Sequence, residues 1–224
     1  MVTSVIIPAL DEAGNIAGLV AAARAQPVDE VIVVDNGSSD PTAAVAAAAG
    51  AAVVAESRRG YGYACAAGSA AARGDILVFL DGDGSSLPAE MLRLIEPLRA
   101  DAADLVLGSR VLGHIAAGAM PPHQRTGNWL AASLMRRLYR VQVTDLGPYR
   151  AIRRDLLGDL DMREMTFGWP TEMMVKAARR GARIHEVPVS CLARTWGRSK
   201  VGGSLRGSLF AAYRILSVTL RYAR

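Results

Sequence analysis

Short apolar runs alternate with longer amphipathic segments through the first half of the chain, and this alternation predicts the fold. The runs are rich in Val, Ile and Leu, which is typical of parallel strands covered on both faces. We expect strands over 4–8, 30–35, 51–56, 75–80 and 104–109. The segments between them predict helices over 13–25, 61–73 and 88–99, and an alanine-rich helix between Pro41 and Gly50. This alternation predicts a mostly parallel, doubly wound α/β sheet.

The pattern changes after residue 110. Residues 111–124 are rich in Gly, Ala and Pro and predict a loop. The elements expected next are a basic helix over 125–141, a turn and short strand over 145–154, a helix over 170–180, and a strand, a break and a second strand over 183–194. We expect these elements to extend the same sheet rather than to form a second domain.

The chain length of 224 residues fits one large domain. We place it over 1–203, with a nucleotide-binding half over 1–110 and an acceptor half over 111–203. Residues 204–224 predict a basic amphipathic helix, in which Arg206, Arg214, Arg221 and Arg224 share one sector beside a stripe of Leu and Ala. Such a helix can bind an anionic membrane surface or pack on the domain, and the sequence leaves both open.

The charge of the chain is divided between its two halves. Residues 1–120 carry 7 Lys and Arg against 14 Asp and Glu, whereas residues 121–224 carry 19 against 7. The acidic half suits a metal and the basic half suits an anionic partner. No apolar run reaches the roughly 18 residues of a membrane span, and the first strand has no basic region before it. We therefore expect a cytoplasmic protein that is not secreted, with Cys65 and Cys191 as free thiols.

Acidic residues follow three of the predicted strands. Asp11 and Glu12 come after the first strand, Asp35 after the second, and Asp81 and Asp83 after the fourth. The carboxyl ends of parallel strands meet at one edge of the sheet, where ligands bind in open α/β folds. Carboxylates gathered there repel one another unless cations or hydrogen-bond donors lie among them, and oxygen ligands without His or Cys favour Mg²⁺ or Mn²⁺. An ordinary Asp-Gly turn would also account for residues 81–84 taken alone.

Six segments, in this order, resemble family 2 glycosyltransferases and, among them, the polyprenyl-phosphate mannose and glucose synthases. The matching segments are PALDE (8–12), VVDNGSSD (33–40), RRGYGYACAAG (58–68), LDGDG (80–84), DLGPYRAIRR (145–154) and RTWGRSK (194–200). The resemblance covers about residues 3–203, and its last segment discriminates best for the lipid-phosphate branch. It implies a single GT-A-like, Rossmann-like domain and an inverting, metal-dependent hexosyltransferase.

The resemblance also implies roles for individual residues. Around the nucleotide sugar it places Pro8, Glu12, Asp35, Gly60 and Asp81, with Asp35 accepting a hydrogen bond from the base. Asp81 and Asp83 would bind Mg²⁺ or Mn²⁺ at the diphosphate. The residues expected near phosphate oxygens of the donor or the lipid are Arg125, Arg194, Ser199 and Lys200. Ser85 replaces a Gln found in some relatives, so a third protein ligand to the metal is undefined.

The reaction implied is transfer of a hexose from UDP-glucose or GDP-mannose to a polyprenyl phosphate, at a peripheral position on the inner membrane surface. A phosphate acceptor is already ionised at neutral pH, so it needs cations rather than a strong base. A soluble transferase acting on a saccharide or small hydroxyl acceptor is the alternative, and it would need a carboxylate base. Glu172 and Asp145 are the candidates, although Glu172 in the first turn of a helix also suits the helix dipole.

A non-catalytic nucleotide or nucleic-acid binding protein is a third hypothesis, suggested by the isoelectric point of about 9.6. Acids at the strand ends would repel a polyanion, so we expect no nucleic-acid partner. Among the aromatics, Trp169 and Trp196 lie beside the matching segments and are expected to stack on a sugar or line a lipid groove. Trp129 lies on the basic helix, where we expect it to pack in the core.

Overall fold

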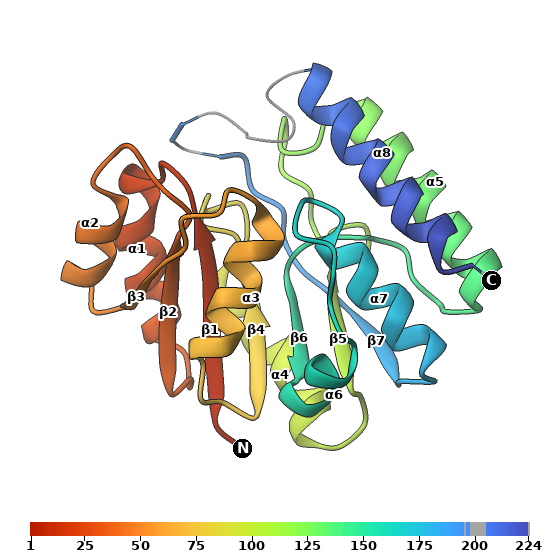
Figure 1. The fold of residues 1–224 in the computed structure, drawn as a ribbon, viewed down its shortest axis with the longest axis horizontal. Coiled ribbons are helices and arrows are strands. Elements are labelled where there is room, and N and C mark those ends of the chain that lie inside the picture. The colour runs from red at the N-terminus through yellow and green to blue at the C-terminus, as the bar shows by residue number, and fades with distance from the viewer. Residues whose placement is uncertain (195, 198–204, 224) are drawn as a thin grey trace.

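A seven-stranded sheet with helices on both faces forms the centre of the part of the chain that the structure describes (Figure 1). This computed structural model describes residues 1–194, 196–197 and 205–223, of which 205–209 are described by their backbone only. The strands are β1 (Thr3–Ala9), β2 (Glu30–Asp35), β3 (Ala52–Ala55), β4 (Ile76–Phe79), β5 (Leu105–Ser109), β6 (Arg150–Arg153) and β7 (Ile184–Pro188). Their order in the sheet is β3-β2-β1-β4-β6-β5-β7.

Two apolar layers enclose the sheet, because alternate residues of each strand point to opposite faces. In β2, Val31 and Val33 belong to one layer, while Ile32 and Val34 belong to the other. The first layer packs under α1 (Ala13–Arg24), α2 (Thr42–Ala48) and α4 (Met91–Arg99), the last preceded by the short 3₁₀ helix η1 (Pro88–Glu90). The second packs under α3 (Tyr61–Ala71), α5 (Pro122–Tyr139), α6 (Arg154–Asp159) and α7 (Trp169–Arg179). This two-sided burial explains the nearly continuous apolar strands.

The sheet is parallel except at β6, which runs antiparallel to both of its neighbours, β4 and β5. The other pairings, including β1 with β2 and with β4, and β5 with β7, are parallel. The prediction of a mostly parallel single sheet is therefore confirmed, and the second half of the chain does extend it. Because β6 is reversed, the turn that precedes it lies at the same edge of the sheet as the carboxyl ends of the other strands.

The element boundaries agree with the sequence to within a few residues, and three differences have physical causes. Helix α5 begins at Pro122, three residues before the expected start, because proline suits the first helical turn. The second strand expected within 183–194 is reduced to one isolated bridge between Ile115 and Cys191. Helix α6 was not expected, because its six residues are too few to show a helical period.

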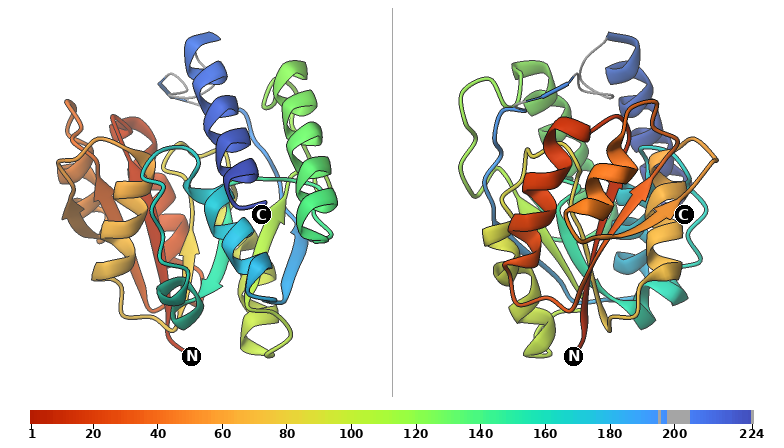
Figure 2. Two further views of the ribbon diagram at one scale, coloured as in Figure 1. Left: turned by 45° about the vertical axis from the view of Figure 1, so that its right-hand side comes forward. Right: turned by 90° about the vertical axis from the view of Figure 1, so that its left-hand side faces the viewer.

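The C-terminal helix α8 (Leu205–Arg221) is confirmed, and it lies beside α5 and against α7 (Figures 1 and 2). The hydroxyl of Tyr139 on α5 donates to the carbonyl of Thr219 on α8. Val218 and Thr219 are buried between the helices. The boundary predicted at 203 and 204 lies outside the described residues. In the described part of the chain, no helix has both the length and the apolarity that a bilayer span requires.

Candidate active site

The carboxyl ends of six strands meet at one edge of the sheet, which we call the strand-end edge. β1 is paired with β2 so that Ala9 lies opposite Asp35, and with β4 so that Ile6 lies opposite Phe79. Two residues after Phe79 comes Asp81. The register therefore brings the chain segments that follow β1, β2 and β4 to neighbouring positions, as the positions of their acidic residues predicted.

Arg194 joins two of these carboxylates. Its Nη1 donates to Glu12 Oε1 at 2.7 Å, and its Nη2 donates to Asp83 Oδ2 at 2.9 Å. The three side chains are 17, 5 and 22% exposed, respectively. These residues are 182 and 111 positions apart in sequence. The predicted convergence of early carboxylates with a late arginine is therefore present in the fold.

Asp81 lies in a half-buried position between a tyrosine and its acidic neighbour. The Tyr61 hydroxyl donates to Asp81 Oδ1 at 2.9 Å. Burial, and then the negative charge of Asp83, raise the pKa of Asp81 to about 7. Asp83 Oδ1 accepts the backbone N–H of Ser85 at 2.9 Å. A pair of carboxylates that disfavours its own double ionisation is stabilised by a cation.

The donor set fits a hard divalent cation, because both groups are carboxylates and a diphosphate adds further oxygens. Among the described residues there is no group of three or more His, Cys, Asp or Glu side chains placed to hold a metal ion. Asp81 and Asp83 would therefore hold Mg²⁺ or Mn²⁺ together with oxygens from a ligand and water. This agrees with the sequence, which defines no third protein ligand to the metal because Ser85 replaces a Gln found in some relatives.

The segment that carries Arg194 passes over the strand-end edge and is attached on both sides. The N–H of Leu192 donates to the carbonyl of Ser85 at 2.8 Å. Beyond Arg194, the ring of Trp196 lies on the start of α1, where a Cβ on Gly14 would come within 2.5 Å of it. Only glycine allows this approach. Trp196 is thus beside the candidate site, as predicted, with 59% of its surface exposed.

Three more predicted residues lie at or after the carboxyl ends of β1, β2 and β3. Pro8 is half-buried near the end of β1. Asp35 Oδ1 accepts the N–H of Ser38 at 3.1 Å, and the N–H of Gly60 donates to Asn36 Oδ1 at 2.9 Å. Asp35 is a half-buried carboxylate at its strand end. Its role with a base, and those of Pro8 and Gly60, stay predictions.

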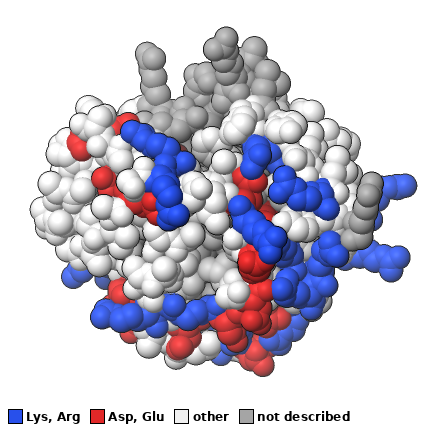
Figure 3. All heavy atoms as spheres, in the orientation of Figure 1, with Lys and Arg blue, Asp and Glu red and all other residues white. Residues whose placement is uncertain are grey.

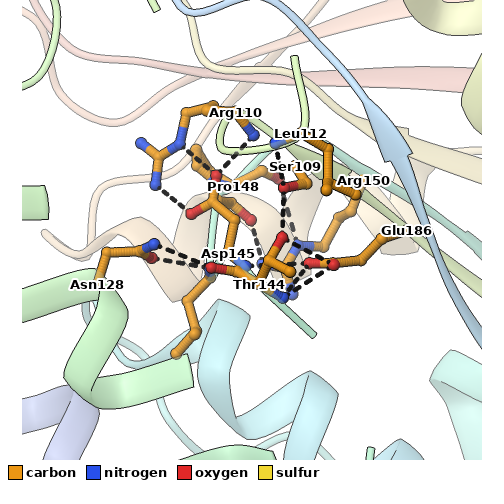
Figure 4. A network of polar contacts seen from close by, with 11 residues as sticks. Ser109, Arg110, Leu112, Asn128, Thr144, Asp145, Pro148, Arg150 and Glu186 are labelled. Carbon is orange, nitrogen blue, oxygen red and sulfur yellow. Dashed lines mark hydrogen bonds and ion pairs between the residues drawn. The ribbon is translucent and has the colours of Figure 1, made fainter. Parts of the chain in front are cut away.

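A second polar network lies at the same edge, around the turn before β6 (Figure 4). Asp145 is 1% exposed and accepts three hydrogen bonds from Arg110, from its backbone N–H at 2.8 Å, from Nε at 2.7 Å and from Nη2 at 2.7 Å. Glu186 accepts from the N–H groups of Thr144 and Asp145. Asp145 therefore orients Arg110, and the proposal that it acts as a base is wrong because its oxygens are taken up by that arginine.

Arg110 is a candidate that the sequence reasoning missed. It directly follows β5, and its side chain is 25% exposed. Its positive charge acts against the rise in the pKa of Asp81 that burial and Asp83 cause. Tyr61 at the start of α3 was missed as well. Ligands bind at the carboxyl ends of the strands in such folds, so a basic residue that directly follows a strand, as Arg110 does, is a candidate for the same reason as an acidic one.

Glu172 does not face an acceptor. Its side chain is fully buried. Its carboxylate accepts hydrogen bonds from the backbone N–H groups of Arg163 and Glu164 and from the Tyr222 hydroxyl, and it forms an ion pair with Lys176. Burial alone would raise the pKa of Glu172, but these hydrogen bonds outweigh it, so its pKa lies below the usual range. The expectation that Glu172 is a catalytic base is therefore wrong, because no acceptor hydroxyl reaches a carboxylate enclosed in this way.

Two tryptophan predictions are also wrong. Trp169 is 1% exposed and packs edge-on against Phe79 of β4 with ring centroids 4.9 Å apart, so it belongs to the core and does not stack on a sugar. Trp129 is 64% exposed, so it is not in the core. The buried side of this helix is instead lined by Ala131, Ala132 and Met135.

Of the other residues expected near phosphate oxygens, only Arg125 belongs to the described part of the chain. Arg125 is exposed in the first turns of α5, and its Nε donates to the carbonyl of Met120. Ser199 and Lys200 lie outside the described residues, so their roles stay predictions.

The comparisons with known proteins agree with this geometry. The family model for glycosyl transferase family 2 matches residues 4–161. The chain is 40% identical, over 93% of both chains, to an uncharacterized glycosyltransferase of Mycobacterium tuberculosis. It is 34% identical to the undecaprenyl-phosphate mannosyltransferase of Micrococcus luteus, over 82% of this chain and 80% of that protein.

A solved structure also resembles the whole fold. Glucosyl-3-phosphoglycerate synthase from Mycobacterium tuberculosis, in complex with Mn²⁺, uridine diphosphate and phosphoglyceric acid, superposes with a TM-score of 0.80 and 25% identity. The match covers 99% of this chain and 78% of that chain. The same synthase has been crystallised with Mg²⁺ and uridine diphosphate.

Proposed function

The chain belongs to glycosyl transferase family 2, and we propose that it transfers a hexose from a nucleotide diphosphate sugar to a polyprenyl phosphate, with inversion at the sugar. The observation that carries the proposal is the bridge from Arg194 to Glu12 and Asp83 at the strand-end edge. It brings a cation for phosphate oxygens within contact of a carboxylate suited to a divalent ion.

The donor would bind along the ends of β1, β2 and β4. Asp35 would accept a hydrogen bond from the base, and Glu12 would hydrogen-bond the nucleotide. Mg²⁺ or Mn²⁺ held by Asp81 and Asp83 would offset the charge that develops on the departing nucleoside diphosphate. Arg194 would move from its carboxylate partners to the diphosphate, since a guanidinium binds either anion through the same paired N–H groups.

A phosphate acceptor suits the groups on the other side of the site. Arg110 is held at the strand-end edge by Asp145 and is partly exposed, so it would contribute one or more N–H groups to an acceptor phosphate. A hydroxyl acceptor would need a base, and the two carboxylates considered for that purpose, Glu172 and Asp145, are buried and hydrogen-bonded. This difference favours a phosphate nucleophile, which is ionised without help.

Both the names of relatives and the ligand of a solved structure support a phosphate-bearing acceptor. The Micrococcus luteus relative is named for undecaprenyl phosphate, and a Mycolicibacterium smegmatis relative, 32% identical over 93% of this chain, is named polyprenol monophosphomannose synthase. The solved synthase was crystallised with phosphoglyceric acid. We favour the lipid, which would place the enzyme at the inner membrane surface, and we treat phosphoglycerate as the competing acceptor.

The test is transfer of radioactive hexose by the purified full chain. UDP-glucose and GDP-mannose would each be supplied with Mn²⁺ or Mg²⁺, and with undecaprenyl phosphate, 3-phosphoglycerate or a saccharide. We expect label in the organic extract with one of the donors and undecaprenyl phosphate, and none when the metal is chelated. Label found only in water-soluble products, with undecaprenyl phosphate also present, would overturn the lipid assignment. The Arg183→Gln variant, altered at the opposite edge of the sheet, serves as the active control.

A further inference from the structure

Helix α8 has apolar side chains on two sides, and among the described residues only one of these sides is covered by the rest of the protein. Ala211 and Val218 are buried. On the other side, Tyr213 is 63% exposed and Leu220 is 56% exposed, and both line an open groove on α8 with Leu216, Ser217 and Arg221. An apolar helix face that is not packed on its own domain marks an interaction surface.

The neighbouring helix α5 adds further apolar side chains. Trp129 and Leu130 are more than half exposed on α5, and Phe210 is exposed near the start of the described part of α8. The two helices lie side by side, and both begin near the strand-end edge (Figures 1 and 2). We call the following side chains of α5 and α8 the helix-pair surface: the exposed Trp129, Leu130, Phe210, Tyr213 and Leu220, and the partly exposed Leu216.

The charged residues of α5 and α8 themselves are all basic. No Asp or Glu occurs in the sequence between Asp104 and Asp145, or after Glu186, so neither helix contains an acidic residue. Arg137 and Arg221 are exposed and form no ion pair with a described carboxylate. Figure 3 shows a largely uncharged surface over α8 with Lys and Arg side chains on both of its sides. The occupant that this combination fits is apolar and surrounded by negative charge.

We propose that the helix-pair surface docks on an anionic lipid bilayer, with α5 and α8 lying in the plane of the interface. Tryptophan and tyrosine favour the headgroup region, where the ring is apolar and its polar atom stays hydrated. Arginines at the margin add attraction to anionic headgroups. This inference deepens the proposed function, because a lipid acceptor would then reach the strand-end edge from the membrane beside it.

Polar contacts fix this surface to the body of the enzyme. Arg214 turns away from the exposed face and forms an ion pair with the buried Glu164, and its Nε also donates to Thr166. The residue between them, Met165, accepts the N–H of Gly62 in the first turn of α3, next to Tyr61. The docked helix is therefore connected, through residues 164–166, to Gly62, which is the neighbour in sequence of the tyrosine that hydrogen-bonds Asp81.

Vesicle flotation of the full chain tests the docking without any acceptor. We expect the protein to float with vesicles of phosphatidylcholine and phosphatidylglycerol, more weakly at high salt, and not with phosphatidylcholine alone. The double change Arg137→Gln and Arg221→Gln should weaken binding about 30-fold. The double change Tyr213→Ser and Leu220→Ser should weaken it at least about tenfold. Two controls lie away from α5 and α8: Val53→Ser, on the edge strand β3 at the other end of the sheet order, and Arg73→Gln, after α3. Both should bind as the wild type does.

Three results would overturn the proposal. The first is a wild-type chain that transfers hexose to a polyprenyl phosphate in detergent but does not float with anionic vesicles. The second is a dimer in sedimentation velocity that Tyr213→Ser converts to monomer, because a second copy would then cover the surface. The third is equal loss of vesicle binding in the control variants. Conversely, vesicle binding without any hexose transfer in detergent would contradict the proposed function and leave the docking intact.

Discussion

Replacing Arg194 by glutamine should change the binding of two ligands in opposite directions. In the structure Arg194 is the cation paired with Glu12 and Asp83, at 2.7 and 2.9 Å. In the proposed function, a divalent cation at Asp81 and Asp83 would compete with that guanidinium for one carboxylate. A diphosphate, in contrast, would need the guanidinium as a donor. Glutamine keeps most of the volume and some hydrogen bonding but removes the charge.

The magnitudes follow from the burial of the partners. A hydrogen bond to a charged group contributes about 1.5–3 kcal/mol, and the partly exposed Asp83 places its bond to Arg194 near the lower end of that range. Part of this is retained by the glutamine amide, so about 1 kcal/mol of competition should disappear, which is roughly fivefold tighter Mn²⁺ binding. Loss of the contact to a diphosphate should weaken binding of uridine or guanosine diphosphate by about 10- to 100-fold at saturating Mn²⁺.

Two calorimetric titrations measure these effects without any turnover. One adds Mn²⁺ to the protein alone, and the other adds the nucleoside diphosphate to the protein with Mn²⁺. The control is Arg183→Gln, because Arg183 also pairs with two carboxylates, Asp101 and Asp104, but at the amino ends of the strands. We expect the control to bind both ligands normally. If Arg194→Gln weakened the binding of both Mn²⁺ and the nucleoside diphosphate, the idea that Arg194 exchanges its carboxylate partners for the diphosphate would be refuted.

Three further changes separate catalytic from structural residues. Asp83→Ala should abolish metal-dependent hexose transfer while the melting temperature stays within a few degrees; retained turnover would contradict its assignment. Gly62→Ala should destabilise the fold by about 1–3 kcal/mol in chemical denaturation, because the added Cβ would lie 2.5 Å from the Glu164 carbonyl, whereas Gly18→Ala, with open space around it, should not. Glu172→Gln should cost about 3 kcal/mol of stability and leave the kcat of the folded enzyme unchanged. The pKa of Glu172 is lowered in the folded protein. The contribution of its carboxylate to the free energy of unfolding is therefore present above the usual carboxyl pKa and is lost as the pH falls through the lowered value. The difference in stability between the variant and the wild type should shrink in acid.

The central strands of the sheet could be predicted because β1, β2, β4 and β5 are buried on both faces. A run such as EVIVVD has no solvent face, and β2 matches the predicted boundaries of 30–35 without adjustment. The reversed β6 could not be predicted from its own residues, since a buried antiparallel strand has the same composition as a buried parallel one. Its direction depends on the loop of residues 140–149, which returns the chain to the strand-end edge instead of crossing the sheet.

The candidate site could be predicted as far as strand direction determines it. Carboxylates directly after strands converge because parallel strands end at one edge, and Glu12 and Asp83 confirm this by sharing Arg194. Side-chain burial is not determined in this way. Glu172 and Trp169 occupy the first turn of α7, close in sequence to segments that resemble the family, but the helix turns both of them inward. Their roles depend on the packing of α7 against β4 and α8, which no local pattern encodes.

The division of charge between the two halves of the chain contributes ion pairs that hold the two halves together. The acidic half supplies carboxylates at the ends of β1 and β4, and the basic half supplies Arg194 from the segment after β7. Their ion pairs hold the late segment over the early strands, so the same charges that would bind a metal and a diphosphate also assemble the place where both would bind. If a metal bound the carboxylates and a diphosphate bound the guanidinium, as we propose, the charge at the strand-end edge would stay balanced. Such a site would favour binding of the two ligands together, because either one alone would leave an unpaired charge in a partly buried position.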